Sequence, residues 1–564
     1  MTGFGQGGKG KFKVKKLPVL LLGLLFMMSL LTGCGGNEDK QGAGGGGEVE
    51  KIIRTAEGNV PKLDPGVGSD YSSSVALCNL YDTLVFPNAD GTLKPMLATH
   101  WETSPDGLTW TFDLRQGVKF HNGEELTAED VVFSMERMLK MGEGYAYLFT
   151  NVLEEAKVLE PYKVQFKLKK SFGPFLSSLV RLYILDKSQV MANLKQPGPY
   201  GEMGDYGKEW LVSNDAGSGP FKVKEFKIQE YLYADRFADY WGGWEQDAPE
   251  SFKIIGTSAA TTIRTLMTRQ ELEISDQWQT EESLKALSGI PGVEINSVFL
   301  GSMFNIMLNT KKAPTDDIHF RKALAYAFDY KTVEERIFPG SKKAIGPVPF
   351  NLPGVASDLP QYERNLEKAK EELAKSKYAN QLDQYPVEIA WIADVPDEEK
   401  IALLFQTNAA ELGIKVNIFK TPWLSFTDQV VSPESTANAN TVFVSPHYNE
   451  AGSMLESRYH SKSTGTWEQC EWLKDPNIDA AIEDAIGTLD TQQRLAKYQA
   501  IQATLVDLCP TVWAFDQAEK RAYQTEYIYW PTAEDQKAGK PVNTVMGYAY
   551  YFHDFKVFPD KKTK

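Results

Sequence analysis

The side chains that usually carry out covalent chemistry are few in this sequence, and their spacing builds no known catalytic motif. Neither H-E-x-x-H nor G-x-S-x-G occurs, and the histidines lack the spacing of metal ligands. Residues 3–8 satisfy G-x-G-x-x-G, but no predicted strand precedes them. The sequence therefore favours binding over catalysis and predicts no catalytic residue, no metal site and no cofactor. The six histidines are His100, His121, His319, His447, His460 and His553.

The N-terminus has the pattern of an export signal. Five lysines precede an apolar run over residues 17–31, which is too short to span a membrane comfortably. Leu31-Thr32-Gly33-Cys34 then resembles the bacterial lipobox, in which the cysteine is lipidated. These patterns predict a lipoprotein signal peptide over residues 1–33, followed by a lipid anchor at Cys34 and a glycine-rich tether that together cover residues 34–47. An uncleaved membrane anchor is the alternative.

The remainder of the chain is acidic and rich enough in apolar residues to fold. The 564 residues have a formal charge of −15, and removal of the five lysines in residues 1–33 takes this to −20. A body with this charge does not attract nucleic acid or anionic lipid. Because 42% of the residues are apolar, the chain can bury sizeable cores and is expected to be globular.

Cysteine use is sparse. The chain has Cys34, Cys78, Cys470 and Cys509, with no C-x-x-C pair and no zinc spacing. Outside the cytoplasm, Cys470 and Cys509 can form a disulfide, and buried free thiols are the equal alternative.

The clearest structural pattern lies in residues 90–139. Apolar and polar residues alternate over 109–114, which is the period of a strand with one buried face. Asn122-Gly123 predicts a turn, and Thr127 is expected to cap a helix, with Asp130 three residues further on. The expected apolar face of this helix consists of Val131, Met135, Met138 and Leu139.

Residues 387–419 have the pattern of a β-α-β unit. A strand is predicted over residues 387–391, Asp397 is expected to cap the following helix, and residues 414–419 predict a second strand. A helical crossover implies parallel strands in a layered α/β lobe. Two later helices are predicted by the apolar faces Ile478, Ala481, Ile482 and Ala485, and Leu495, Tyr498, Ile501, Leu505 and Leu508.

Short sequence elements spread over most of the chain carry a family resemblance. They are Leu63-Asp64-Pro65, Leu80-Tyr81-Asp82-Thr83-Leu84-Val85, Pro95-x-Leu97-Ala98, Trp101-Glu102-x-Ser104, Asp106-Gly107, Leu114-Arg115-x-Gly117-Val118-Lys119-Phe120-His121, Thr127-Ala128-Glu129-Asp130-Val131, Gly217-Ser218-Gly219-Pro220-Phe221, residues 305–329 and 368–373, and Leu412-Gly413-Ile414-Lys415-Val416. In this order they resemble the extracellular solute-binding proteins of ABC importers, in the oligopeptide, dipeptide and nickel-binding family (bacterial family 5).

The resemblance implies an α/β, two-lobed fold of the periplasmic-binding-protein type (class II). Lobe one is expected to comprise residues 48–298 and 511–564, with an inserted subdomain at about 83–169, and lobe two residues 299–510. The implied mechanism is capture of a small organic solute by closure of the lobes. The implied partners are ABC permease subunits. The protein is expected to be a monomer, anchored to the outer face of a bacterial membrane or in the periplasm through Cys34.

The segment over residues 440–459 is expected to decide which solute binds. Where peptide-binding relatives have an Asp-Tyr-Asn-Glu or similar acidic element, this chain has His447-Tyr448-Asn449-Glu450. The resemblance implies that the aspartate of those relatives pairs with the α-amino group of the peptide. A neutral histidine instead hydrogen-bonds to an uncharged solute, and Glu450 is the alternative anion.

Three tryptophans are further candidate ligand-binding residues. Trp423 matches a cleft position of the family, and Trp278 and Trp513 lie close to the expected lobe crossings. Flat rings stack on sugar faces, and they also line pockets for peptide side chains. Together with the replaced aspartate, they make an oligosaccharide or another uncharged solute the alternative to a peptide.

Three classes of function follow from these patterns. The first is the solute-binding component of an importer, for a peptide or an oligosaccharide. The second is a binding lipoprotein that senses or presents its ligand without transport. The third is an extracellular hydrolase, for which the sequence offers no nucleophile or carboxylate pair.

Overall fold

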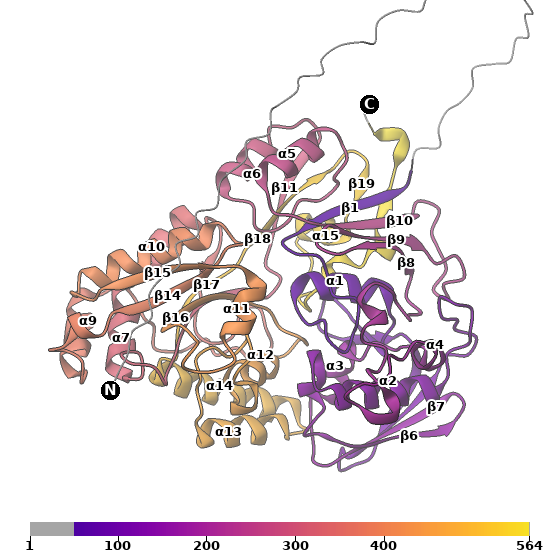
Figure 1. The fold of residues 1–564 in the computed structure, drawn as a ribbon, viewed down its shortest axis with the longest axis horizontal. Helices are drawn as coiled ribbons and strands as arrows, with labels where there is room; N and C mark the ends of the chain where they lie inside the picture. The colour runs from indigo at the N-terminus through magenta and orange to yellow at the C-terminus, as the bar shows by residue number, and fades with distance from the viewer. Residues whose placement is uncertain (1–49, 563–564) are drawn as a thin grey trace, which may run out of the picture. The chain divides into compact units, whose positions relative to one another are not determined.

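The first lobe is built around a sheet whose strands come from distant parts of the chain (Figure 1). The computed structural model describes residues 50–562. In the order β1-β10-β9-β8, β1 pairs in parallel with β10, and the other neighbours are antiparallel. A separate antiparallel ladder joins β11 to β18. These strands are β1 (Ile52–Glu57), β8 (Phe221–Lys227), β9 (Tyr231–Arg236), β10 (Ser251–Gly256), β11 (Val293–Val298) and β18 (Glu519–Gln524).

Residues 90–139 contribute to a second sheet and to the helix that packs on it. Strand β5 (Thr109–Leu114) buries every second residue, which confirms the predicted alternation. Helix α2 (Ala128–Met141) begins with a capping box formed by Thr127 and Asp130, which confirms the predicted cap. The remaining strands of this sheet, in the order β4-β5-β7-β6, are β4 (Ala98–Thr103), β6 (Leu153–Glu160) and β7 (Lys163–Leu168).

The glycine-rich element at residues 217–221 joins this region to helix α1 (Tyr71–Leu80). A Cβ at Gly217 would lie 1.9 Å from the carbonyl oxygen of Leu80, so only glycine fits there. The backbone N–H of His121 donates to the carbonyl oxygen of Gly217 at 2.9 Å. These motif residues therefore serve the packing of the first lobe.

The second lobe contains a six-stranded mixed sheet in the order β13-β17-β12-β16-β14-β15. Strands β14 and β15 are parallel and flank helix α10 (Asp397–Ala410), which confirms the predicted β-α-β unit. The predicted cap at Asp397 is wrong, because Pro396 is the N-cap and Asp397 instead pairs with Lys400 at 2.9 Å. The strands are β12 (Met303–Leu308), β13 (Lys342–Lys343), β14 (Val387–Ile392), β15 (Val416–Thr421), β16 (Ala439–Val444) and β17 (Thr511–Asp516).

Helices surround both sheets. The two helices predicted from apolar faces near the end of the second lobe are α13 (Pro476–Ile486) and α14 (Thr491–Leu508), which pack against each other. The other long helices are α5 (Ala260–Thr268), α6 (Glu281–Leu287), α7 (Ile318–Ala327), α9 (Leu366–Lys375), α11 (Trp423–Gln429), α12 (Ala451–Tyr459) and α15 (Pro531–Lys537).

The chain crosses between the lobes twice. The first crossing lies between the end of β11 and the start of β12. The return crossing lies at residues 517–518, between β17 and β18. The expected return at residue 511 coincides with the first residue of β17, which pairs with both β12 and β13 in the six-stranded sheet.

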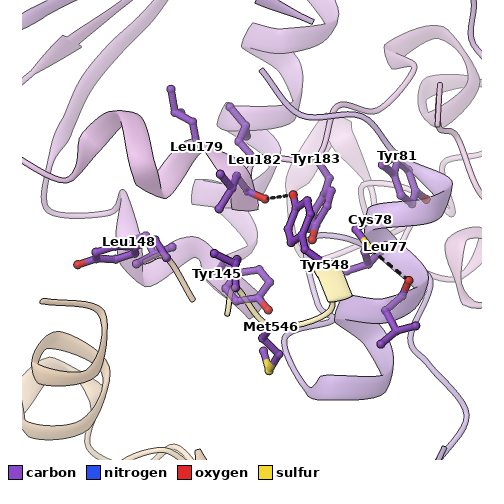
Figure 2. Packing of buried hydrophobic residues seen from close by; sticks show 14 of the residues in the cluster. Leu77, Cys78, Tyr81, Tyr145, Leu148, Leu179, Leu182, Tyr183, Met546 and Tyr548 are labelled. Carbon is purple, nitrogen blue, oxygen red and sulfur yellow. Dashed lines mark hydrogen bonds between the residues drawn. The ribbon is translucent and has the colours of Figure 1, made fainter. Parts of the chain in front are cut away.

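The C-terminal segment completes a hydrophobic core of the first lobe (Figure 2). Tyr145, Tyr183 and Tyr548 are buried there beside Cys78. The hydroxyl group of Tyr548 donates to the carbonyl oxygen of Val180 at 2.8 Å. The segment around Tyr548 is therefore part of the interior of the first lobe.

The structure corrects the disulfide alternative. Cys78, Cys470 and Cys509 are all buried free thiols. Cys470 and Cys509 belong to different hydrophobic clusters, and the thiol of Cys470 donates to the carbonyl oxygen of Trp467 at 3.2 Å. Burial raises the pKa of the Cys509 thiol to about 11, so this group stays protonated and unreactive.

The predicted signal peptide (residues 1–33), the predicted lipid anchor at Cys34 and the tether up to residue 47 lie outside the described residues. Within residues 50–562, none of the helices combines the length and apolar character needed to cross a membrane.

Candidate ligand-binding site

A pocket that we call the aromatic cleft lies between the two lobes, and both lobes supply its walls. The space between its walls, including solvent at the mouth, is about 730 Å³. The lining residues of the first lobe are Gly58, Asn59, Asp70, Tyr71, Ser72, Gln277, Trp278 and Met546. Ser302 lines it at the first crossing, and the second lobe contributes Ile392, Asp394, Val395, Glu398, Trp423, Val442, Phe443, Ser445 and Trp467.

Aromatic rings from both lobes form part of the wall. The ring centroids of Trp278 and Phe443, which belong to opposite lobes, are 5.0 Å apart. Trp423 and Trp467 meet edge to face with centroids 5.2 Å apart. A Cβ at Gly58 would lie 3.1 Å from the ring of Trp278, so the glycine lets this ring lie close to the backbone. The cleft therefore offers flat apolar surfaces to a ligand.

Three carboxyl groups also line the cleft: those of Asp70, Asp394 and Glu398. Asp70 caps helix α1 by accepting from the backbone N–H of Ser73 at 2.8 Å. Asp394 accepts from the backbone N–H of Trp423 at 2.9 Å, which fixes the start of α11. The cleft thus combines apolar rings with groups that attract a cation.

Glu398 has one engaged and one free carboxyl oxygen. Its Oε2 accepts hydrogen bonds from the backbone N–H of Ile392 (2.8 Å) and from the hydroxyl group of Thr441 (2.6 Å). Its Oε1 is buried and has no partner among residues 50–562. Burial raises the pKa of Glu398 to about 8, and the nearby charge of Asp394 acts in the same direction. This group donates to a carbonyl oxygen when protonated and pairs with a cation when ionised.

A buried ion-pair network fixes the wall that the first lobe supplies. Arg521 of β18 donates to Glu57 at 2.8 Å and to Glu519 at 2.9 Å. It also donates to the side-chain oxygen of Gln277 at 2.7 Å, and the Tyr71 hydroxyl group donates to Glu519 at 2.9 Å. Because Gln277 and Tyr71 line the cleft, the network positions them for a ligand.

Of the seven residues predicted to bind ligand, Trp278 and Trp423 line the aromatic cleft. Trp513 does not, because its ring is buried and its Nε1 donates to the hydroxyl group of Tyr459 at 2.8 Å. The other four predicted residues, His447 to Glu450, also lie outside the lining of the cleft.

His447 is buried between residues of the two lobes. Its side chain is only 1% exposed, and its Nε2 lies 2.8 Å from a carboxylate oxygen of Glu468. The rings of Tyr145 and Tyr147 pack edge-on against it, with centroids 5.2 and 5.9 Å away. Arg181 donates to its carbonyl oxygen at 2.7 Å. His447 therefore joins the two lobes beside the cleft.

The three residues after His447 are likewise engaged internally. Tyr448 is fully buried, and the side-chain oxygen of Asn449 accepts from the hydroxyl group of Thr544 at 3.1 Å. Glu450 forms a two-pronged ion pair with Arg494 at 2.6 and 3.0 Å. Arg494 therefore already neutralises Glu450 in this structure, and the alternative in which Glu450 supplies the anion for a ligand stays a prediction.

Sequence reasoning missed Asp394, Glu398 and Trp467. Glu398 lies in the first turn of α10, where acidic residues are common because they interact favourably with the positive end of the helix dipole. Asp394 follows the carboxyl end of the parallel strand β14, a usual ligand position in α/β sheets, and this signal could have found it. Trp467 lies in a loop without a sequence pattern. The part of the chain described here contains no group of three or more His, Cys, Asp or Glu residues able to hold a metal ion.

Two α/β lobes, two chain crossings and a pocket lined from both sides define a two-lobed solute-binding protein. The comparison with protein families agrees, because residues 92–465 match the bacterial extracellular solute-binding proteins, family 5 (middle region). The chain belongs to this family, whose members are binding proteins of ABC importers and not enzymes.

Individual relatives cover most of the chain. A probable D,D-dipeptide-binding periplasmic protein of Escherichia coli is 28% identical over 488 residues, which are 84% of this chain and 90% of the relative. Heme-binding protein A of Haemophilus influenzae is 26% identical over 471 residues, 79% of this chain and 82% of the relative. The ABC transporter-associated periplasmic binding protein DppA from Helicobacter pylori, solved with the peptide STSA, has the same fold. Its TM-score is 0.79 at 22% identity, over 91% of this chain and 98% of that one.

Proposed function

We propose that this protein is the solute-binding component of an ABC importer and that it holds a peptide or peptide-like solute in the aromatic cleft. The observation that carries the proposal is the meeting of the carboxyl groups of Asp70, Asp394 and Glu398 with the rings of Trp278 and Trp423. Carboxyl groups pair with an amine, and aromatic rings accept apolar side chains. Relatives named for dipeptides and a fold neighbour solved with a peptide support the same ligand class.

An oligosaccharide or another uncharged solute is the second candidate. The rings of Trp278, Trp423 and Trp467 favour it, because sugar faces stack on flat rings. Gln277 adds a polar side chain to the same wall. The two candidates differ in charge, since an uncharged sugar leaves the carboxyl groups of the cleft without a counter-charge.

The proposal includes closure of the lobes on the solute. Two of the polar contacts that cross between them beside the cleft are weak. Lys400 of α10 lies 3.5 Å from Glu282 of α6, and the Ser258 hydroxyl group donates to the carbonyl oxygen of Asp394 at 3.4 Å. The exposed ion pair of Lys400 and Glu282 costs little to break. We expect the radius of gyration in solution scattering to fall when a saturating solute is added, and an unchanged radius contradicts closure.

The proposal also places the folded body outside the cytoplasm as a monomer on a lipid anchor at Cys34. Its support is the lipobox-like Leu31-Thr32-Gly33-Cys34. Metabolic labelling with a fatty acid should mark the wild type in the membrane fraction, and Cys34→Ala should lose the label. Mass photometry of the purified body should give the mass of one chain.

Native mass spectrometry of protein purified without added ligand, followed by identification of the released solute, tests the ligand class. Calorimetry with free peptides, the same peptides N-acetylated, and oligosaccharides separates the candidates. We expect the free peptides to bind about tenfold or more tightly than their acetylated forms, because acetylation removes the cation. Binding must also raise the melting temperature. Failure of both peptides and oligosaccharides to bind overturns the proposal.

A further inference from the structure

A second hollow, which we call the apolar groove, opens beside the aromatic cleft. Three of the ten large apolar side chains that are exposed within residues 50–562 gather here: Val212 (47% exposed), Ile228 (66%) and Leu424 (63%). They come from three different segments, which are the short helix η4 (Trp210–Val212), the turn after β8, and α11. Exposed apolar side chains that converge on one hollow mark a binding surface more often than scattered ones do.

The apolar groove is continuous with the aromatic cleft. Gly58, Asn59 and Asp70 line both hollows. At the start of α11, Trp423 lines the cleft and the next residue, Leu424, lines the groove. Both lobes therefore contribute to the groove as they do to the cleft. A solute longer than the cleft has a direct path into the groove past the carboxyl group of Asp70.

The aromatic cleft is lined by acidic side chains without basic ones, whereas the apolar groove is lined by both acidic and basic side chains. The cleft holds only carboxyl groups as charged side chains. In the groove, Asp64 is paired with Arg137 at 2.7 Å, and Lys208 is paired with Glu143 at 2.6 Å. Lys62 lines the groove and forms no ion pair with another residue of the described chain. The cleft thus attracts the cationic end of a ligand. Among the described residues, the unpaired ammonium group of Lys62 at the groove attracts an anionic end.

We propose that the apolar groove is a second subsite, which holds the apolar side chains of a short peptide whose amino group lies among the carboxyl groups of the aromatic cleft. This inference rests on the proposed function of the cleft and narrows its substrate class to peptides with large apolar side chains. Such side chains remove Val212, Ile228 and Leu424 from water, whereas small side chains leave them exposed. The carboxylate at the far end of the peptide matches the charge of Lys62.

Calorimetry with trialanine and trileucine tests the subsite in the wild type and in the double variant Ile228→Ser/Leu424→Ser. Both side chains are exposed, so these substitutions have little effect on folding. We expect the wild type to bind trileucine about tenfold or more tightly than trialanine. The double variant loses most of this preference and keeps its affinity for trialanine. Leu403→Ser is the matched control, because Leu403 is another exposed leucine (50%) that lies outside both hollows, and it leaves both affinities unchanged.

Each result decides between the two proposals. Equal affinities for the two tripeptides in the wild type, or an unchanged preference in the double variant, overturn the second subsite and leave the proposed function standing. Failure of the wild type to bind either tripeptide overturns the peptide assignment and this inference with it. Sedimentation that reveals a dimer abolished by Ile228→Ser/Leu424→Ser assigns the groove to a second copy of the chain and also overturns the subsite.

Discussion

The hydroxyl group of Thr441 donates a hydrogen bond of 2.6 Å to the carboxyl group of Glu398 inside the wall of the aromatic cleft. Thr441 lies on β16 and Glu398 on α10, so the bond joins the central part of the six-stranded sheet to its crossover helix. It engages Oε2 and leaves Oε1 as the oxygen without a partner among the described residues. The protonation of this one carboxyl group therefore affects the stability of the fold and, in the proposed site, the binding of a ligand.

We expect Glu398 to make the protein less stable as the pH rises. Its pKa is about 8 in the folded protein and ordinarily 4.5, so between these values the folded state holds a proton that the unfolded state has lost. The stabilisation is complete below the ordinary pKa and is lost as pH rises towards about 8, at about 1.4 kcal/mol per pH unit. Glu398→Gln should remove this contribution from denaturant-unfolding curves measured across the window. A variant with the same pH slope as the wild type would falsify the assignment.

Trp423→Ala should weaken solute binding. The substitution removes a ring of the cleft wall that meets Trp467 edge to face, and loss of such a wall costs about 1.5–3 kcal/mol, or about 10- to 100-fold in affinity. Trp101→Ala is the matched control, because Trp101 is also half-buried but lies on β4, outside the cleft. Calorimetry on both variants makes the comparison. Equal affinities in the two variants would remove Trp423 from the site.

Arg494→Met should destabilise the protein without changing the ligand preference of the folded form. It leaves the carboxylate of Glu450 buried and unpaired, which typically costs about 3–5 kcal/mol in the free energy of unfolding. Adding Glu450→Gln should recover much of this loss, because the stranded charge is then gone. If Glu450→Gln alone abolishes solute binding in a protein of wild-type stability, Glu450 belongs to the ligand site after all.

The thiols of Cys78, Cys470 and Cys509 should all be free. We expect the denatured Cys34→Ala protein, kept without reductant, to react with one equivalent of thiol reagent per remaining cysteine, and the native protein to react very slowly because all three are buried. Reductant should leave the melting temperature unchanged. If the denatured protein reacts with only one equivalent of reagent, at Cys78, then Cys470 and Cys509 form a disulfide.

Sequence patterns predicted those features that depend on interactions between residues close to one another in the sequence. The capping box of Thr127 and Asp130 and the alternation in β5 are of this kind, and the structure contains both. The β-α-β unit also followed from local periodicity, although Pro396 and not Asp397 caps its helix.

The roles of His447 and Glu450 could not be predicted in the same way. Their partners, Glu468 and Arg494, are distant in the sequence and come close only when the second lobe folds. The family resemblance indicated where the segment lies, but it did not indicate which residues contact it. Glu398 was missed for the opposite reason, since an acidic residue at a helix start is ordinary until a sheet buries it.

The return crossing at residues 517–518 has a consequence for the order in which the lobes are completed. Every strand of the six-stranded sheet of the second lobe lies within residues 303–516. The first lobe contains β1, the first strand of the described residues, but it also needs β18 as the partner of β11 and Tyr548 in its core. Because a chain is synthesised from its N-terminus, the second lobe can complete its sheet before β18 and Tyr548 of the first lobe have been made. The synthesis of the first lobe therefore starts before that of the second lobe, but its fold is completed after it.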